Sequence, residues 1–322
     1  MTFRVAVLSK DLKVNGGNRV AIEVTARMRL RGWDARIFVE FPTVSVPEGW
    51  ISDELPIKPI DAIDSFEPDV GIATYFTTSR ILNQLTCHRG RLQYVQARYN
   101  PRFERNERRA LMREALFSPA SSKVVVSHYL KEWLSSLGVE ATVVPPGLNH
   151  EIFYPLRRDG ETAFRVLIEG DLRRPAKRVP VAYACVPAEF EIWGLGPVDH
   201  GLHASRMWVD PPQGQLSRVY SSCHALVKLA RGEGLSLAIM EAMACGVVPV
   251  CSDEGGHRDF CVDGFNSVIV KRDAAVSDVL TWLRDNEDAW HALSTNARAT
   301  AHSFEWDRTV TGLEGLFLKT RE

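Results

Sequence analysis

The most informative stretch of the chain is Arg231-Gly-Glu-Gly-Leu-Ser-Leu-Ala-Ile-Met-Glu-Ala-Met-Ala-Cys-Gly246. It begins as a glycine-flanked loop at Glu233 and continues with apolar residues all round a helical turn, which predicts a largely buried helix. Gly234 lets the backbone turn, and Ser236 is placed to satisfy first-turn N–H groups. Glu241 lies inside this helix. Because a buried carboxylate is costly when it is unpaired, the sequence predicts a partner for Glu241.

The two carboxylates of this stretch flank the beginning of the predicted helix. Helical rise over the eight positions from Glu233 to Glu241 corresponds to about 12 Å. Free N–H groups and the positive end of the helix dipole lie between them and favour an anion. A nucleotide diphosphate-sugar has the matching layout of ribose, diphosphate and sugar. The alternative is a core helix in which Glu241 pairs with an Arg or a Lys.

The residues after the helix extend the pattern. The order is Glu233, seven residues, Glu241, then Ala242-Met-Ala-Cys-Gly-Val-Val-Pro-Val250 and, five residues on, Gly255-Gly256. This order resembles the signature of the GT4-type, or group 1, glycosyltransferases of the GT-B fold. The resemblance implies an α/β protein with two Rossmann-like, doubly wound domains that face each other across a cleft. It also implies sugar transfer with retention of configuration.

Length and composition agree with a two-domain globular enzyme. The chain has 322 residues, 25% charged residues and a net charge of −1, so no overall field favours nucleic acid. Its six cysteines form no CxxC pair, which predicts reduced thiols. There is no signal-peptide pattern and no apolar run of about 18 residues. These features predict a cytoplasmic protein.

Apolar runs typical of buried parallel strands recur along the chain. They lie at 3–9, 35–40, 68–74, 91–96, 123–127, 141–144, 164–169, 189–194, 206–210, 225–229, 247–252 and 268–270. A proline-rich exit at 145–155 divides them into two sets. We therefore expect an N-terminal Rossmann-like acceptor-side domain at 1–155, joined by a C-terminal helix at about 304–322. A C-terminal Rossmann-like donor domain is expected at 156–303, and residues from about 274 to 300 are expected to be helical.

Two glycine-containing loops are expected to approach the donor phosphates. Gly16 and Gly17 follow the first strand, and the resemblance places such a turn at the interdomain cleft. The GxGxxG dinucleotide pattern is absent, so NAD is not expected. In the second loop, Asp171 replaces the arginine that is usual in the family, and Arg173 or Arg174 could substitute for it with Lys177 as the second cation. The alternative for these basic residues is a solvated loop.

The resemblance assigns roles to the remaining site residues. Glu241 binds the ribose diol, and Glu233, the catalytic residue, contacts the donor sugar and stabilises an oxocarbenium-like state. The diphosphate is held by Arg173, by Lys177 and by N–H groups of Gly234, Leu235 and Ser236. No Asp-x-Asp occurs, so neither a metal nor another cofactor is expected, because fixed cations can stabilise the leaving group. The implied enzyme is a hexosyl- or deoxyhexosyltransferase.

The acceptor is not identified by the sequence, and a saccharide, a lipid-linked compound or a small molecule all remain open. Gln96 stands where many relatives carry a histidine, which hints at rhamnosyl-like transfer. Basic residues gather at 98–113 and could meet an anionic acceptor or the inner face of a membrane. Interleaved acidic residues favour a solvated helix face instead. A nucleotide-sugar epimerase and a non-catalytic GT-B scaffold remain the alternative functions.

Overall fold

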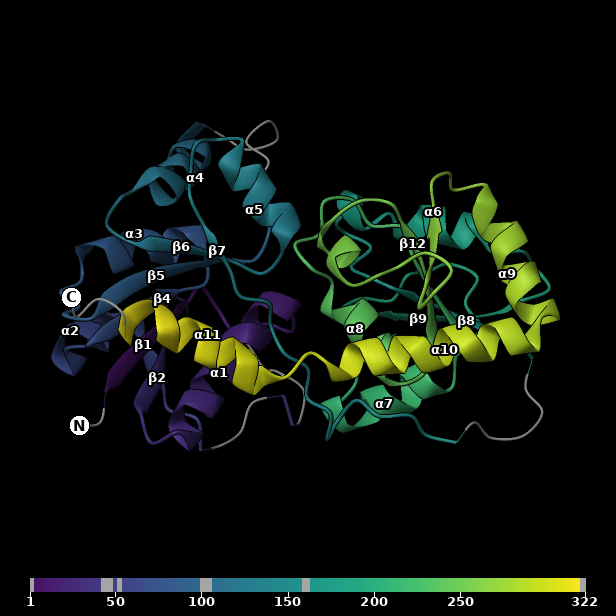
Figure 1. Cartoon of the computed structure of the whole chain (residues 1–322), viewed down its shortest axis with the longest axis horizontal. Helices are drawn as coiled ribbons and strands as arrows, with labels where there is room; N and C mark the ends of the chain where they lie inside the picture. Colours follow the sequence, from purple (N-terminus) through teal and green to yellow (C-terminus); the bar gives the residue numbers. More distant parts are fainter. Residues whose placement is uncertain (1–2, 42–48, 51–53, 99–105, 158–162, 319–322) are drawn as a thin grey trace. The chain divides into compact units, whose positions relative to one another are not determined.

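The computed structural model describes residues 3–41, 49–50, 54–98, 106–157 and 163–318 (Figure 1). The chain forms two compact units. The N-terminal unit comprises Met1–Val46, Trp50–Gly147 and Glu305–Glu322, and the C-terminal unit comprises Pro47–Gly49 and Leu148–Phe304.

The N-terminal unit is built on a parallel sheet with the order β3-β2-β1-β4-β5-β6-β7. Its strands are β1 (Arg4–Ser9), β2 (Asp34–Val39), β3 (Ile57–Pro59), β4 (Val70–Ala73), β5 (Gly90–Val95), β6 (Ser122–Val125) and β7 (Thr142–Val143). The helices are α1 (Gly16–Leu30), η1 (Ile60–Ala62), α2 (Ile63–Phe66), α3 (Phe76–Gln84), α4 (Asn106–Phe117), α5 (His128–Ser135) and α11 (Trp306–Leu318).

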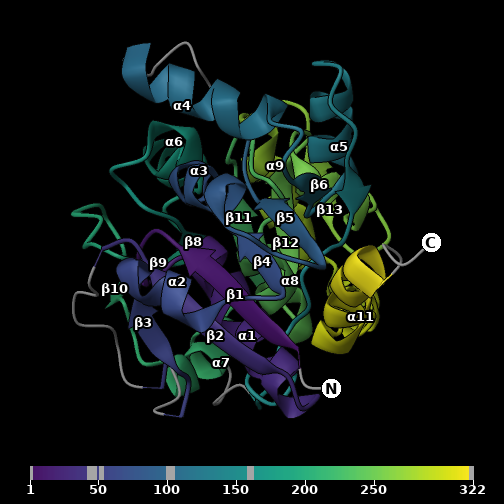
Figure 2. The ribbon, with the colours of Figure 1, turned by 90° about the vertical axis from the view of Figure 1, so that its left-hand side faces the viewer.

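Successive side chains of β2 show that helices cover both faces of this sheet. Phe38 packs with residues of α2 and α3, including Phe66 and Leu82. Its neighbours Ile37 and Val39 point to the opposite face and pack with Ile22 of α1. Successive side chains of a strand point to opposite faces, so a continuous apolar run is what a strand covered on both sides requires. In Figure 2, α1 and α11 lie together on one side of this sheet.

The C-terminal unit repeats the plan with the strand order β10-β9-β8-β11-β12-β13, again all parallel. Its strands are β8 (Arg165–Glu169), β9 (Glu191–Gly196), β10 (Arg206–Val209), β11 (Ala225–Lys228), β12 (Val248–Ser252) and β13 (Val268–Val270). The helices are η3 (Pro175–Lys177), α6 (Val179–Cys185), α7 (Gln213–Ser221), α8 (Leu237–Ala244), η4 (Gly256–Asp259), α9 (Ala275–Asp285) and α10 (Glu287–His302). The prediction of two Rossmann-like, doubly wound domains is confirmed.

The boundary between the units differs from the predicted one. The structure divides the chain after Gly147, whereas the sequence placed the division after residue 155. Residues just past the division are bonded to α7 of the C-terminal unit. Ser217 donates its hydroxyl to the Tyr154 carbonyl at 2.6 Å, and the Leu156 N–H donates to the Ser221 hydroxyl at 3.0 Å. The proline-rich exit therefore belongs largely to the second unit.

The C-terminal part of the chain shows two further features. The stretch expected to be helical at about 274–300 forms two helices, α9 and α10, which are separated at Asn286 because its backbone (φ −125°, ψ 77°) is not helical. Helix α11 belongs to the N-terminal unit, where Glu314 accepts a hydrogen bond from Arg31 at 2.6 Å and Thr309 donates one to the Pro145 carbonyl at 2.8 Å.

Substitution of Gly147 tests whether the chain returns to the N-terminal unit at the start of α11. A Cβ atom at this position would overlap the backbone of Trp306 and lie 2.5 Å from the carbonyl carbon of Glu305. We expect Gly147→Ala to lower the free energy of unfolding by about 1–3 kcal/mol, because backbone atoms cannot yield as a flexible side chain can. Chemical denaturation measures the effect.

Gly315 of α11 is the matched control, because a Cβ there meets nothing within 4 Å. Gly315→Ala should be neutral or stabilise by up to about 1 kcal/mol through its higher helix propensity. Equal effects of the two substitutions would contradict the close approach of residue 147 to the start of α11.

Candidate functional site

The strand order of the C-terminal unit changes direction between β8 and β11. In open parallel sheets, ligands bind outside the carboxyl ends of the strands at such a switch point. The last residues of the two strands are Glu169 and Lys228, and the Lys228 ammonium bonds directly to the Glu169 carboxylate. A buried ion pair therefore marks the switch point.

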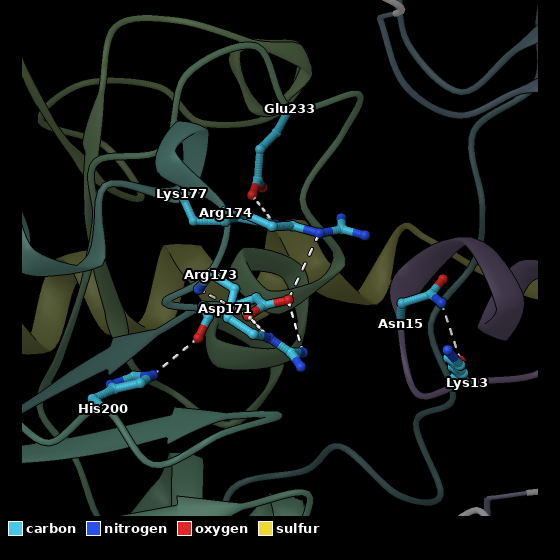
Figure 3. Close-up of polar contacts among 9 residues, drawn as sticks. Lys13, Asn15, Asp171, Arg173, Arg174, Lys177, His200 and Glu233 are labelled. Carbon is cyan, nitrogen blue, oxygen red and sulfur yellow. Dashed lines mark hydrogen bonds and ion pairs between the residues drawn. The ribbon is translucent and has the colours of Figure 1, made fainter. Parts of the chain in front are cut away.

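A second carboxylate joins this pair. Glu233, in the loop after β11, has its Oε1 atom 3.5 Å from the Lys228 Nζ. Lys177, at the end of η3, donates a hydrogen bond to the same Oε1 atom. Figure 3 shows Lys177 and Glu233 pointing toward each other from loops that follow different strands. Two lysines and two glutamates thus form one cluster, which we call the switch-point cluster (Glu169, Lys177, Lys228 and Glu233).

Burial differs sharply within this cluster. The side chains of Lys228 and Glu233 are 2% and 11% exposed, whereas that of Lys177 is 25% exposed. Burial alone would raise the pKa of Glu233, but Lys228 and Lys177 hold that pKa well below its ordinary value. Burial likewise acts against the Lys228 ammonium, yet Glu169 and Glu233 raise the pKa of Lys228 above its ordinary value. Lys228 and Glu233 are therefore both charged at neutral pH.

The Glu233 loop is fastened to the glycine pair that follows β12. The Gly256 N–H donates to the Glu233 carbonyl at 2.9 Å. Gly255 has a φ of 108°, and a Cβ atom on it would lie 3.0 Å from the same carbonyl oxygen. Only glycine adopts this backbone readily, so the Gly-Gly pair is what lets η4 approach Glu233.

Helix α8 begins at Leu237, directly after Ser236. Ser236 was expected to cap its first turn, but the Ser236 side chain makes no capping hydrogen bond. The reason is its left-handed backbone with a φ of 78°, because capping serines adopt extended dihedrals. Since the helix starts at Leu237, Glu233 lies outside it. The helical rise of about 12 Å therefore does not describe the separation of Glu233 and Glu241.

Glu241 has the partner that its position in α8 predicted. Tyr220 of α7 donates its phenol hydroxyl to the Glu241 Oε2 atom at 2.8 Å. Tyr220 is 1% exposed, and burial together with the Glu241 charge raises its pKa. A tyrosine that stays protonated fixes the orientation of this carboxylate without neutralising it.

The arginines expected near a diphosphate are engaged elsewhere. Arg173 makes two hydrogen bonds to the Asp171 carboxylate, at 2.8 and 3.1 Å. Arg174 lies 3.7 Å from the same carboxylate, and both guanidinium groups are mostly exposed (Figure 3). The pKa of Asp171 is lowered by these contacts. The structure thus brings Lys177 to Glu233, and places Arg173 and Arg174 around Asp171.

Gly16 and Gly17 begin α1 in the N-terminal unit, just after the carboxyl end of β1. Asn15 caps the helix by accepting the Asn18 N–H at 2.9 Å. Gln96 donates its side-chain amide to the Gly17 carbonyl at 3.2 Å. β1 and β4 form the switch point of this sheet, which places the loop where a ligand of this unit would bind.

The Arg-rich stretch at 98–113 is described only in part, because 99–105 lie outside the described residues. Within α4, Arg108 donates to the Tyr75 hydroxyl at 2.9 Å and its guanidinium lies over the Phe76 ring. None of the helices in the described ranges combines the length and the apolar character needed to cross a bilayer. Contact of this stretch with a membrane stays a prediction.

Sequence analysis missed Lys228, Glu169 and Tyr220. The two charged residues carried a signal in the sequence, and the tyrosine did not. Glu169 and Lys228 are charged residues that directly end apolar strands, and ladder neighbours at a switch point bring such residues together. Tyr220 lies 21 residues before Glu241, and only the packing of α7 on α8 joins them.

Comparison with known proteins identifies the segment that carries most of this site. Residues 206–300 match the model of the family glycosyl transferases group 1. An uncharacterized glycosyltransferase of Methanocaldococcus jannaschii is 24% identical over 213 residues, 61% of this chain and 59% of that protein. A D-inositol 3-phosphate glycosyltransferase of Actinosynnema mirum is 31% identical over 116 residues, 35% of this chain and 28% of that protein. The chain therefore matches less than two thirds of either relative.

Solved structures share the fold over nearly the whole chain. Alr3699/HepE of Anabaena in complex with UDP-glucose has a TM-score of 0.81 at 12% identity and covers 98% of this chain and 99% of its own. Sucrose-phosphate synthase from Thermosynechococcus elongatus has a TM-score of 0.78 at 16% identity, with 98% of both chains covered. These likenesses confirm the GT-B fold class. Together with the family match they support a group 1 glycosyltransferase.

The charge on Glu233 predicts a pH dependence of stability. Its pKa is lower in the folded chain than in the unfolded chain, so the stabilisation exists above the unfolded value of about 4.3 and is lost as the pH falls toward the folded value. We expect the free energy of unfolding of wild type to exceed that of Glu233→Gln by about 3 kcal/mol at pH 7. The difference should shrink between about pH 5 and pH 2, as measured by urea denaturation at each pH.

Glu254→Gln is the control, because Glu254 is half exposed and lies 3.9 Å from Arg231. That substitution should change stability by less than about 0.5 kcal/mol. If the difference in free energy of unfolding between wild type and Glu233→Gln stayed constant down to pH 2, Glu233 would not be held ionised by the two lysines.

Proposed function

We propose that this chain is a glycosyltransferase that moves a sugar from a nucleotide-sugar donor to an acceptor, with the C-terminal unit binding the donor. One observation carries the proposal. Within a segment reached by the group 1 family match, the ionised Glu233 is held beside two lysines at the carboxyl end of β11. This is the place in an open parallel sheet where a nucleotide is expected.

The donor contacts follow from the chemistry of the groups present. Glu241, oriented by Tyr220, is suited to accept hydrogen bonds from both hydroxyls of a ribose diol. N–H groups of Gly234, Leu235 and Ser236, at the approach to α8, together with Lys177, would hold the diphosphate. Arg173 would add a second cation by leaving Asp171. In the N-terminal unit, Gly16 and Gly17 begin α1 at the switch point of that sheet, where their N–H groups would approach an anionic ligand of that unit.

Sugar transfer requires stabilisation of two developing charges, one on the sugar and one on the leaving diphosphate. The bond between the anomeric carbon and the diphosphate oxygen breaks while a bond to the acceptor oxygen forms, and the acceptor proton passes to the leaving diphosphate. Glu233 would stabilise positive charge on the sugar, and Lys177 would stabilise negative charge on the diphosphate. We propose that the reaction retains configuration, proceeds without a metal and transfers a hexosyl or deoxyhexosyl group in the cytoplasm.

The similar proteins suggest which compounds to try first. Their names include complexes of Alr3699/HepE with UDP-glucose and of TarM with UDP and α-GlcNAc-glycerol. We therefore place uridine nucleotides first among donors. The names of several relatives, D-inositol 3-phosphate glycosyltransferases, place phosphorylated cyclitols beside saccharides and lipid-linked compounds among the acceptors.

Nucleotide binding tests the donor site. Thermal unfolding is measured with UDP, GDP, dTDP, ADP and NAD, for wild type and for Glu241→Ala. A ligand that binds only the folded state adds about 2.7 kcal/mol at 100 times its Kd, so one nucleoside diphosphate should raise the Tm of wild type by several degrees. Glu241→Ala should lose most of that shift relative to its own Tm. A response to NAD alone, or to no nucleotide, would contradict the proposal.

Turnover separates the enzyme from the two alternatives. Wild type should release nucleoside diphosphate from its nucleotide-sugar, and Glu233→Gln should do so at least about 100-fold more slowly, in keeping with the loss of one charge-stabilising group. Binding without turnover by wild type would indicate a non-catalytic scaffold. Isomerisation of the bound sugar without release of nucleotide would indicate an epimerase.

A further inference from the structure

Lys228 is an unusual residue to end a buried strand. The preceding residues of β11, Ala225, Leu226 and Val227, are completely buried, and Lys228 itself is 2% exposed. Its ammonium reaches the Glu169 carboxylate, the Glu169 carbonyl at 3.4 Å and Glu233 at 3.5 Å. A buried ammonium is costly unless opposite charges surround it, and this one is surrounded.

The switch-point cluster has no net charge, because its two lysines balance its two glutamates. In this structure, the lysine that is proposed to bind the diphosphate, Lys177, is hydrogen-bonded to Glu233. Lys177 therefore has two competing anions when a nucleotide is present. If it turns to the diphosphate, Glu233 loses one of its counter-ions next to a second negative charge.

Accessibility separates the two lysines. Lys177 ends a single 3₁₀ turn with a quarter of its side chain exposed, so an incoming anion can reach it. Lys228 is fixed on the central strand of the sheet beneath Glu169 and Glu233, and it is out of reach of solvent. A fixed, desolvated charge acts more strongly on its neighbours than an exposed one.

We propose that Lys228 is a positioning residue that keeps Glu233 ionised and oriented while Lys177 is released to the anionic group of the nucleotide. The inference rests on the proposed function for the identity of that ligand. Lys228 does not contact the reacting atoms. It acts through Glu233, and its pairing with Glu169 holds it at the end of β11.

Other groups face Glu233 and must be considered in a titration. His257 of η4 lies close to the Glu233 loop, with its Nε2 atom bonded to the Ser252 carbonyl at 2.7 Å. Burial acts against the charged His257 ring, but contacts with Cys251 and the Ser252 carbonyl leave its pKa above the ordinary value. The His257 charge is therefore constant below about pH 6, which is the range in which Glu233 is compared.

The first test needs no ligand. The substitution Lys177→Met imitates the release of Lys177 from Glu233. The pKa of Glu233 is measured by ¹³C NMR of the glutamate carboxyl groups. The Glu233 signal is assigned as the one that is absent from the spectrum of Glu233→Gln. In Lys177→Met the pKa of Glu233 should stay below the ordinary value of about 4.3. In Lys177→Met/Lys228→Met it should rise above that value. An equal rise in Lys177→Met alone would overturn the proposal, because Lys228 would then not suffice to keep Glu233 ionised.

The second test measures protons taken up on binding. UDP-glucose is titrated calorimetrically in two buffers of different ionisation enthalpy at pH 5.5, because the His257 ring stays charged there and the diphosphate diester of the ligand does not titrate. Wild type should bind with no proton uptake, and Lys228→Met should take up close to one proton per ligand. The uptake should vanish in Glu233→Gln/Lys228→Met. Binding by Lys228→Met with no uptake and with unchanged affinity would also overturn the proposal.

Two controls keep the outcomes separate. Lys123→Met removes another buried lysine, whose ammonium is bonded to Ser118 and Ser121 in the N-terminal unit, and should cause no proton uptake. If Lys228→Met fails to fold because Glu169 is left unpaired, Glu169→Gln/Lys228→Met takes its place. If wild type binds no nucleotide-sugar, the proposed function fails, while the ligand-free titration still decides the role of Lys228.

Discussion

The buried contact between Lys228 and its two glutamates constrains the rest of the C-terminal unit. Lys228 is separated from water and Glu233 nearly so, and buried charges are tolerated only while their opposite charges stay in place. Glu169 and Lys228 come from neighbouring strands, so the ladder between β8 and β11 fixes their distance. Glu233 comes from a loop, and the glycine pair of η4 holds that loop against them. The ladder, the loop and η4 therefore have to form together.

The same constraint explains why reactive groups gather at one edge of this sheet. Parallel strands present their carboxyl ends on one side, and reversal of the strand order separates the loops that follow β8 and β11. Lys177 follows β8 and Glu233 follows β11, and their side chains meet in a hydrogen bond. Helix α8 is buried by its own apolar residues and brings Glu241 to the same region, where α7 supplies Tyr220. The apolar packing of α8 thus holds the charged groups of the site in place.

Local patterns in the sequence were sufficient to predict most of the fold and part of the site. Continuous apolar runs predicted the strands, and the stretch from Glu233 to Gly246 predicted the loop and the helix that the structure has there. The errors arose where tertiary contacts decide the outcome. The left-handed backbone of Ser236 prevents the capping hydrogen bond expected of its side chain, and contacts with α7 place the proline-rich exit in the second unit. The contact between Glu169 and Lys228 spans 59 positions, and no local pattern encodes it.

The return of α11 to the N-terminal unit has a consequence for synthesis of the chain. The C-terminal unit is almost one continuous segment, but the N-terminal unit is completed by residues that follow the whole of it. Until α11 emerges from the ribosome, Trp33 lacks the Phe317 ring and Arg31 lacks Glu314. Domains of a nascent chain usually fold in order from the N-terminus. Here the unit made first is finished last, and its exposed α1 face has to stay soluble in the meantime.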